Sequence, residues 1–124
     1  MTVSLVSSIA DTARRPGETR ILIYSHDTFG LGHIRRCRAI ANSLVAGHPN
    51  ISVIIVSGSS VISSFQFGAG VDYVRIPGVE KHTNGSYTSH HLNTNLTETI
   101  RLRQDLIRQL AVSFDPDIVI ADKE

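Results

Sequence analysis

The chain has 124 residues, of which 41% are hydrophobic and 19% charged, a composition typical of one globular domain rather than of a disordered segment. Twelve Lys and Arg residues against eleven Asp and Glu give a net charge of +1, which excludes a strongly cationic nucleic-acid binder. A single cysteine excludes a disulfide framework and a cysteine-based zinc site, and it suits a reducing, cytoplasmic compartment.

Hydrophobic patterning divides the chain into a polar start and an alternating body. Residues 1–19 end in a polar stretch and are expected to form a flexible leader. Beyond them, short β-branched runs alternate with amphipathic segments. The pattern predicts strands at 20–27, 51–57, 71–76 and 117–121, helices at 31–46 and 96–113, a short helix around 60–67, and a long polar loop at 79–95.

Alternation of strands and helices with short connections predicts an α/β fold, a Rossmann-like doubly wound parallel sheet. Ligands of such sheets bind outside the carboxyl ends of the strands. The chain stops directly after its fourth predicted strand. We therefore expect residues 20–124 to be an incomplete domain, the N-terminal part of something larger.

The densest motif lies between the first strand and the first helix, where the sequence reads SHDTFGLGHIRR over residues 25–36. Gly30 and Gly32 allow a tight turn and a close approach of the backbone to a ligand. The helix start behind them offers free N–H groups to a phosphate or an oxyanion. A third glycine is missing because Arg35 stands in its place, and no Gly-Lys-Ser/Thr follows, so neither NAD nor ATP binding is favoured.

His33 falls in the first turn of the predicted helix, where the helix dipole favours a neutral imidazole that can accept a proton. Asp122 ends the fourth strand, which neighbours the first strand in the sheet order 3-2-1-4. The two side chains can therefore meet, and the carboxylate would orient the imidazole. Asp27 is a rival partner or a cap of the turn. The alternatives are a histidine that only hydrogen-bonds the loop and an Asp122 that only begins the next loop, which spacing alone favours.

Basic and imidazole side chains surround this motif and fill the predicted loop. Arg35 stands with Arg36 and Arg38 at the helix start, where these residues either face an anionic group or form a solvated helix surface. The loop carries three histidines: His82, His90 and His91. Adjacent histidines without a suitably spaced carboxylate do not predict a metal site.

The run Gly30-Leu31-Gly32-His33 resembles the first loop of GT-B glycosyltransferases, which have two facing Rossmann-like domains with the substrate cleft between them. Residues 20–46 are similar to predicted glycosyltransferases related to the peptidoglycan N-acetylglucosaminyltransferase family. The run Gly-x-Gly-His-x-x-Arg-Cys-x-x-x-Ala, residues 30–41, also resembles the UDP-sugar hydrolase of pseudaminic acid synthesis, which shares the fold and activates water with the matching histidine. Residues 114–122 look like the Pro-Asp-strand-Asp stretch of these amino-terminal domains.

This resemblance implies the N-terminal, acceptor-side half of a GT-B architecture. The whole protein would transfer a sugar from a nucleotide-sugar donor to an acceptor hydroxyl, without a cofactor or metal. It implies His33 as general base, oriented by Asp122. Substrate-binding roles are expected for five residues: Gly30, Gly32, Asp27, Arg35 and His90.

The donor site of such enzymes lies mainly in a second domain, so the resemblance implies that this chain alone is inactive. The acceptor is a sugar or a lipid-linked molecule, and the second would bring the protein to a membrane surface. No nucleic-acid partner is expected, and the sequence favours no oligomeric state. A nucleotide-sugar hydrolase or epimerase of the same fold, and a non-catalytic Rossmann-like binding domain, are the alternatives.

Overall fold

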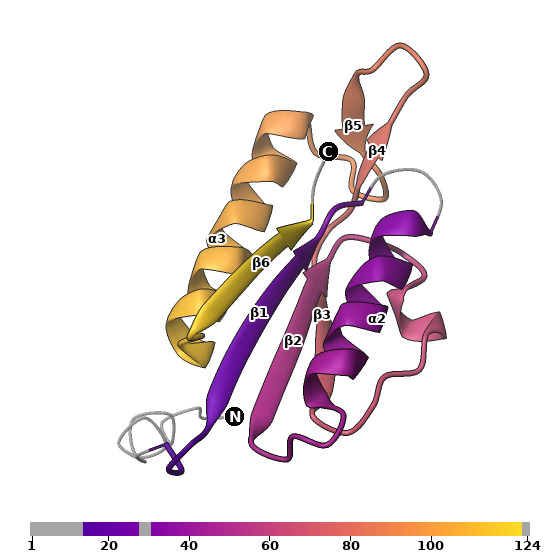
Figure 1. Cartoon of the computed structure of the whole chain (residues 1–124). Helices are drawn as coiled ribbons and strands as arrows, with labels where there is room; N and C mark the ends of the chain where they lie inside the picture. The colour runs from indigo at the N-terminus through magenta and orange to yellow at the C-terminus, as the bar shows by residue number, and fades with distance from the viewer. Residues whose placement is uncertain (1–13, 28–30, 123–124) are drawn as a thin grey trace, which may run out of the picture.

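The computed structural model describes residues 14–27 and 31–122. Within them it contains a parallel sheet, two α-helices, one turn of 3-10 helix and a small antiparallel hairpin (Figure 1). In chain order these are β1 (Thr19–Ser25), α2 (Gly32–Val45), β2 (Ile51–Ser57), η1 (Ile62–Ser64), β3 (Val71–Arg75), β4 (Val79–Lys81), β5 (Tyr87–Ser89), α3 (Leu96–Phe114) and β6 (Ile118–Asp122).

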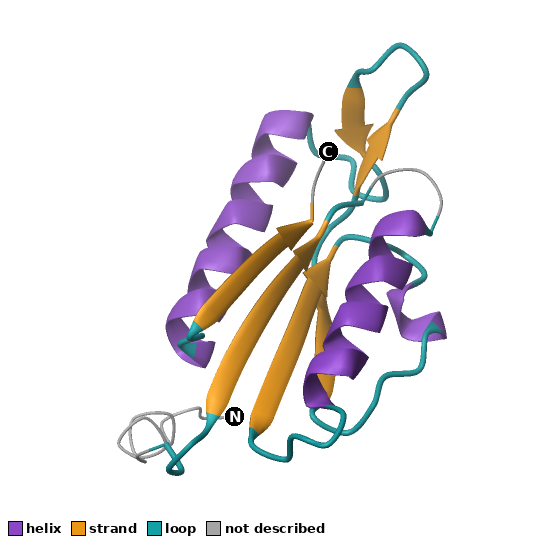
Figure 2. Cartoon of the chain, viewed as in Figure 1, coloured by secondary structure: helices purple, strands orange, loops and turns teal. Residues whose placement is uncertain are grey.

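The four long strands form one parallel sheet in the order β3-β2-β1-β6, which confirms the predicted order. Their carboxyl ends point to the end of the molecule where the β4–β5 hairpin stands (Figure 2). This arrangement is compatible with a Rossmann-like α/β fold. Because both faces of the sheet are covered, its inner strands are continuous apolar runs.

Each face of the sheet packs against one helix. On one face, Ile23 and Ile55 pack against Ile34, Cys37 and Ala41 of α2. On the other face, buried Leu22 and Val56 pack against apolar side chains of α3: Ile107, Leu110, Ala111 and Phe114. The two clusters use alternate residues of the same strands, since successive side chains of a strand point to opposite faces.

Two predicted elements are wrong in detail. The predicted helix at 60–67 is a single 3-10 turn, Ile62–Ser64. The stretch 79–95, predicted to be a loop, contains the hairpin in which Val79 pairs with Ser89 and Lys81 with Tyr87. Three-residue strands of mixed polarity carry no alternating apolar pattern, so they escape detection by periodicity.

The amino-terminal end of the described chain is attached to the opposite end of the sheet. Residues 1–13 of the expected leader lie outside the described residues. Arg14 forms an ion pair with Asp117 at 2.7 Å, and the backbone N–H of Arg20 donates to the same carboxylate at 2.9 Å. This polar cluster, which precedes β6, lies away from the carboxyl ends of the strands and leaves them for the site.

Candidate functional site

The sheet has its topological switch point between β1 and β6. The chain runs from β1 outward through β2 and β3, then returns by α3 to place β6 on the other side of β1. The helices that follow β1 and precede β6 lie on opposite faces, and doubly wound sheets bind ligands at such a point, outside the carboxyl ends of the strands; we refer to this point as the crevice. Ser25 and Asp122 are paired there as the last residues of β1 and β6. This crevice is the candidate site.

His33 and Asp122 meet in the crevice. The imidazole Nδ1 of His33 lies 3.2 Å from Oδ2 of Asp122, and the two side chains are only 18% and 12% exposed. Their orientation lacks the angle of a hydrogen bond, so this buried Nδ1 has no hydrogen-bond partner within the described chain. The separation is nevertheless within hydrogen-bond length, and a rotation of the ring would align the two groups. The predicted proximity is therefore confirmed; the catalytic roles stay predictions.

The first turns of α2 surround the Asp122 carboxylate with two more side chains. Arg36 Nη1 lies 3.3 Å from Oδ1, and Cys37 Sγ donates to Oδ2 at 3.7 Å. Together with His33 these residues stand three and four positions apart, and so they share one face of the helix. These contacts hold the Asp122 side chain against α2. The backbone N–H of His26 donates to the backbone carbonyl of Asp122 at 2.9 Å.

Burial raises the pKa of the Cys37 thiol above its usual value, and the neighbouring Asp122 carboxylate raises it further. The thiol is therefore protonated at neutral pH and acts as a hydrogen-bond donor. It is a packing residue of the crevice and not a nucleophile, since the thiolate is the reactive form.

Chemically, the rotation of the ring that aligns the two groups would make the pair an oriented base. A carboxylate beside Nδ1 favours the tautomer with the proton on that nitrogen, which leaves Nε2 to accept a proton. The same carboxylate stabilises the imidazolium that then forms. Arg36, 3.3 Å from the carboxylate, offsets part of its negative charge.

Asp27 does not face His33 as a partner; it anchors the loop after β1. Its carboxylate pairs with Arg103 at 2.5 Å, and it accepts the backbone N–H groups of Gly58 at 2.7 Å and Val79 at 3.2 Å. The side chains of Asp27 and Arg103 are 2% and 7% exposed. A Cβ at position 58 would lie 1.8 Å from Oδ2 of Asp27, so only glycine allows this contact.

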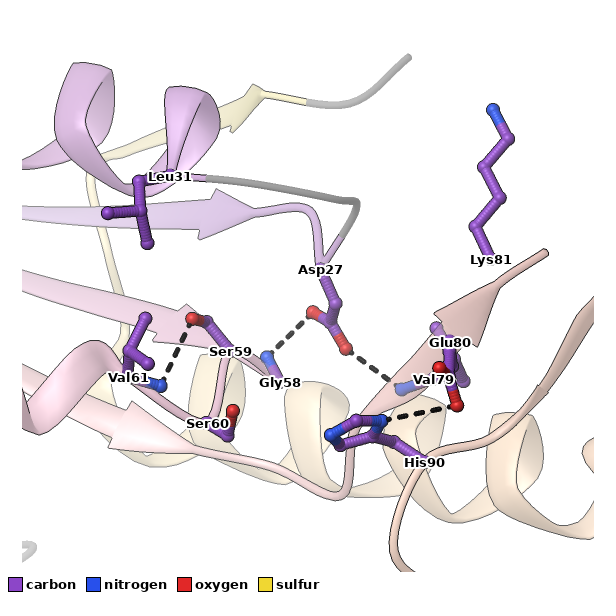
Figure 3. A pocket seen from close by; sticks show the side chains of 10 residues that line it. All are labelled: Asp27, Leu31, Gly58, Ser59, Ser60, Val61, Val79, Glu80, Lys81 and His90. Carbon is purple, nitrogen blue, oxygen red and sulfur yellow. Dashed lines mark hydrogen bonds and ion pairs between the residues drawn. The ribbon is translucent and has the colours of Figure 1, made fainter. Parts of the chain in front are cut away.

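A polar cavity of about 270 Å³ opens beside Asp27, between the end of β2, the start of α2 and the hairpin (Figure 3). His90 lines it, and its Nδ1 lies 3.5 Å from Oε2 of Glu80. Ser60 adds a hydroxyl to the wall. The Lys81 side chain extends away from the other labelled side chains (Figure 3), and its ammonium group lies over the ring of Tyr87, 5.9 Å from the centroid. Figure 3 shows the imidazole of His90 beside the Glu80 carboxylate on the hairpin side of the cavity. Groups of this kind donate to and accept from hydroxyls.

The remaining predicted residues divide between the crevice and its surroundings. Gly30 lies outside the described residues. Gly32 begins α2, and a Cβ built on it meets no atom of the described residues within 4 Å. Arg35 is exposed, and Arg36 is the arginine that reaches Asp122.

Sequence reasoning missed three residues around the site: His26, Tyr87 and Arg103. His26 contacts two tyrosines: its Nδ1 lies 3.4 Å from the hydroxyl of Tyr24, and its Nε2 lies 3.3 Å from that of Tyr87. Its ring meets that of His33 edge-on, with centroids 5.9 Å apart. Arg103 could have been found as a cation on the apolar stripe of a predicted helix, whereas nothing local marks Tyr87.

Among the described residues, no three side chains of His, Cys, Asp or Glu are grouped to hold a metal ion. None of the helices described has the length and apolar character needed to cross a bilayer. Comparison with protein-family models, with curated proteins and with solved structures finds no match to this chain. A functional proposal therefore rests on the motif and on the geometry of the crevice.

Proposed function

We propose that this chain is the acceptor-side domain of a GT-B glycosyltransferase, in which His33 removes the proton of an acceptor hydroxyl. The observation that carries the proposal is the contact of His33 with Asp122 at 3.2 Å, in the crevice between β1 and β6. Two further features support it. The motif that contains His33 resembles the first loop of that family, and the sheet is compatible with its Rossmann-like domains.

In the proposed step, Nε2 of His33 accepts the hydroxyl proton as the acceptor oxygen bonds to the anomeric carbon of the donor. The bond from that carbon to the nucleotide phosphate breaks, and the nucleotide leaves with the bonding electron pair. Asp122 stabilises the imidazolium, which later returns the proton to solvent. The donor itself would be bound mainly by a second domain, as the resemblance implies.

The polar cavity offers a place for the hydroxyl groups of the acceptor. Its wall combines a carboxylate, an imidazole and a hydroxyl group, from Glu80, His90 and Ser60. A polyol can pair with each of these as donor or acceptor. Leu31, the residue before α2, also lines the cavity, so the cavity adjoins the helix start that carries His33.

The decisive experiment replaces His33 in the full-length protein and measures sugar transfer from a panel of nucleotide sugars. We expect His33→Ala to lower the rate by about 100-fold or more, because a positioned base contributes that much. Asp122→Asn should lower it as well, since the amide cannot stabilise the imidazolium. His48→Ala is the matched control: this exposed histidine lies beyond the far end of α2 and should keep full activity.

Two outcomes would favour other functions. Release of free sugar without any acceptor, lost in His33→Ala, would indicate a nucleotide-sugar hydrolase that uses the same base on water. Unchanged turnover in His33→Ala would exclude the catalytic role and favour a Rossmann-like binding domain.

A further inference from the structure

A second cavity lies on the other side of the Asp27–Arg103 pair, between α3 and the hairpin. Its volume is about 360 Å³. Four aliphatic side chains line it: Val79, Leu96, Ile100 and Ile107. Polar groups gather at one end, where the hydroxyls of Tyr24 and Tyr87 contact His26. A mostly apolar concavity with a few converging polar groups is the usual form of a small-molecule site. We refer to it as the apolar cavity.

The walls of the apolar cavity are held in place by contacts that need no ligand. Thr99 of α3, fully buried, shares short hydroxyl contacts of 2.6 Å with Ser89 and with Thr94 at the base of the hairpin. Arg103 joins α3 to the hairpin side through the carbonyl of Pro77 at 2.7 Å and to β1 through the Tyr24 hydroxyl at 2.9 Å. The space between helix and hairpin is thus preformed.

The apolar cavity also leads toward the proposed base. His26 lines the cavity, and its ring lies edge-on to that of His33 with centroids 5.9 Å apart. A molecule that fills the cavity would therefore present its polar end beside His26 and His33. Ile100 remains 39% exposed at the cavity, so an apolar ligand has hydrocarbon surface to cover there.

We propose that the apolar cavity binds a hydrocarbon group of the acceptor, so that the acceptor is an amphiphile whose hydroxyl reaches His33. The identification of the bound molecule as the acceptor rests on the proposed function. The binding of a hydrocarbon group in the cavity can be measured without turnover. The hydrocarbon is an alkyl chain or an aromatic ring, and the experiment distinguishes the two.

The test titrates the isotopically labelled full chain with methyl, butyl, octyl and phenyl β-glucoside below their micellar concentrations, followed by NMR. We expect affinity to rise about fourfold for each methylene that enters the cavity. Amide shifts should centre on Tyr87, Leu96 and Ile100. A stronger response to octyl than to phenyl glucoside identifies an alkyl chain, and the reverse order identifies an aromatic ring.

Two variants on the same helix give the matched comparison. Ile100 is 39% exposed and lines the cavity, whereas Leu102 is 42% exposed and does not. We expect Ile100→Glu to weaken binding of the preferred glucoside at least tenfold, and Leu102→Glu to leave it within twofold. Circular dichroism checks the fold. Should Ile100→Glu fail to fold, the position of the amide shifts in the unaltered chain decides.

Three results would each overturn the inference. The first is an affinity for methyl glucoside equal to that for both octyl and phenyl glucoside. The others are equal effects of the two variants on binding, and amide shifts centred outside the cavity. Its failure is separate from failure of the proposed function. If turnover depends on His33 but a hydrocarbon group does not tighten glucoside binding, the proposed function stands and the inference fails. If hydrocarbon binding depends on Ile100 but His33→Ala keeps full turnover, the hydrocarbon site stands and the proposed function fails.

Discussion

At the scale of single residues, the guanidinium of Arg103 joins parts of the chain that are far apart in sequence. It donates to the Asp27 carboxylate, to the Pro77 carbonyl and to the Tyr24 hydroxyl. It lines the apolar cavity, and its partner Asp27 lines the polar cavity. A buried charge needs such complete pairing, because an unpaired ion in a protein interior costs several kcal/mol. The geometry of both cavities therefore depends on one arginine.

We expect Arg103→Ala to lower the free energy of unfolding by about 3–5 kcal/mol, because it leaves the Asp27 carboxylate buried without its counter-ion. Arg101→Ala is the control, since Arg101 is exposed on the same helix and its removal should cost less than about 0.5 kcal/mol. Urea denaturation of both variants measures the difference. Similar decreases in the free energy of unfolding of the two variants would show that the buried ion pair contributes no more to stability than an exposed arginine.

At the scale of elements, the start of α3 fixes the hairpin as well as the helix. Asn95 caps the helix by accepting the N–H of Glu98 at 2.9 Å. One turn later, Thr99 holds Ser89 and Thr94 through its hydroxyl. The most buried positions of α3 are Thr99 and Arg103, while Ile100 is partly exposed at the apolar cavity.

Asn95→Ala should lower the free energy of unfolding by about 1 kcal/mol, since it removes the side-chain acceptor of the cap. It should also increase hydrogen exchange in the hairpin, which is attached to the first turns of α3. Thr97→Ala, an exposed change in the same turn, serves as the control. If hairpin exchange is the same in Asn95→Ala as in the control, the hairpin does not depend on the cap.

At the scale of the whole molecule, the two ends of the sheet have separate tasks. The carboxyl ends of the strands carry the crevice and both cavities. At the other end, Asp117 binds Arg14 and the backbone of Arg20, residues about a hundred positions away in sequence. The backbone hydrogen bond from Arg20 is the main cause that lowers the pKa of Asp117 below its usual value of 3.8, and Arg14 lowers it further.

A lowered pKa in the folded state means that Asp117 stabilises the fold above its unfolded pKa and loses this effect as the pH falls through the folded one. We therefore expect the free energy of unfolding to decrease below about pH 4, and Asp117→Asn to make that decrease smaller. Urea denaturation from pH 6 to pH 2.5 measures both slopes. Identical slopes would contradict a contribution from Asp117.

The sequence alone predicted the parallel sheet, its strand order and both long helices, and it made the meeting of His33 with Asp122 one of two alternatives. Apolar runs and helical periodicity are local signals, and the doubly wound topology then brings the carboxyl ends of β1 and β6 together. Tertiary structure decided the rest. The hairpin has no periodic pattern of its own, and the Asp27–Arg103 pair joins residues 76 positions apart.

Only the folded chain could select Arg36 over Arg35 as the arginine at Asp122, or bring Tyr87 to His26. Such contacts depend on helix rotation and on the packing of distant segments. Local residue preferences do not encode either of these.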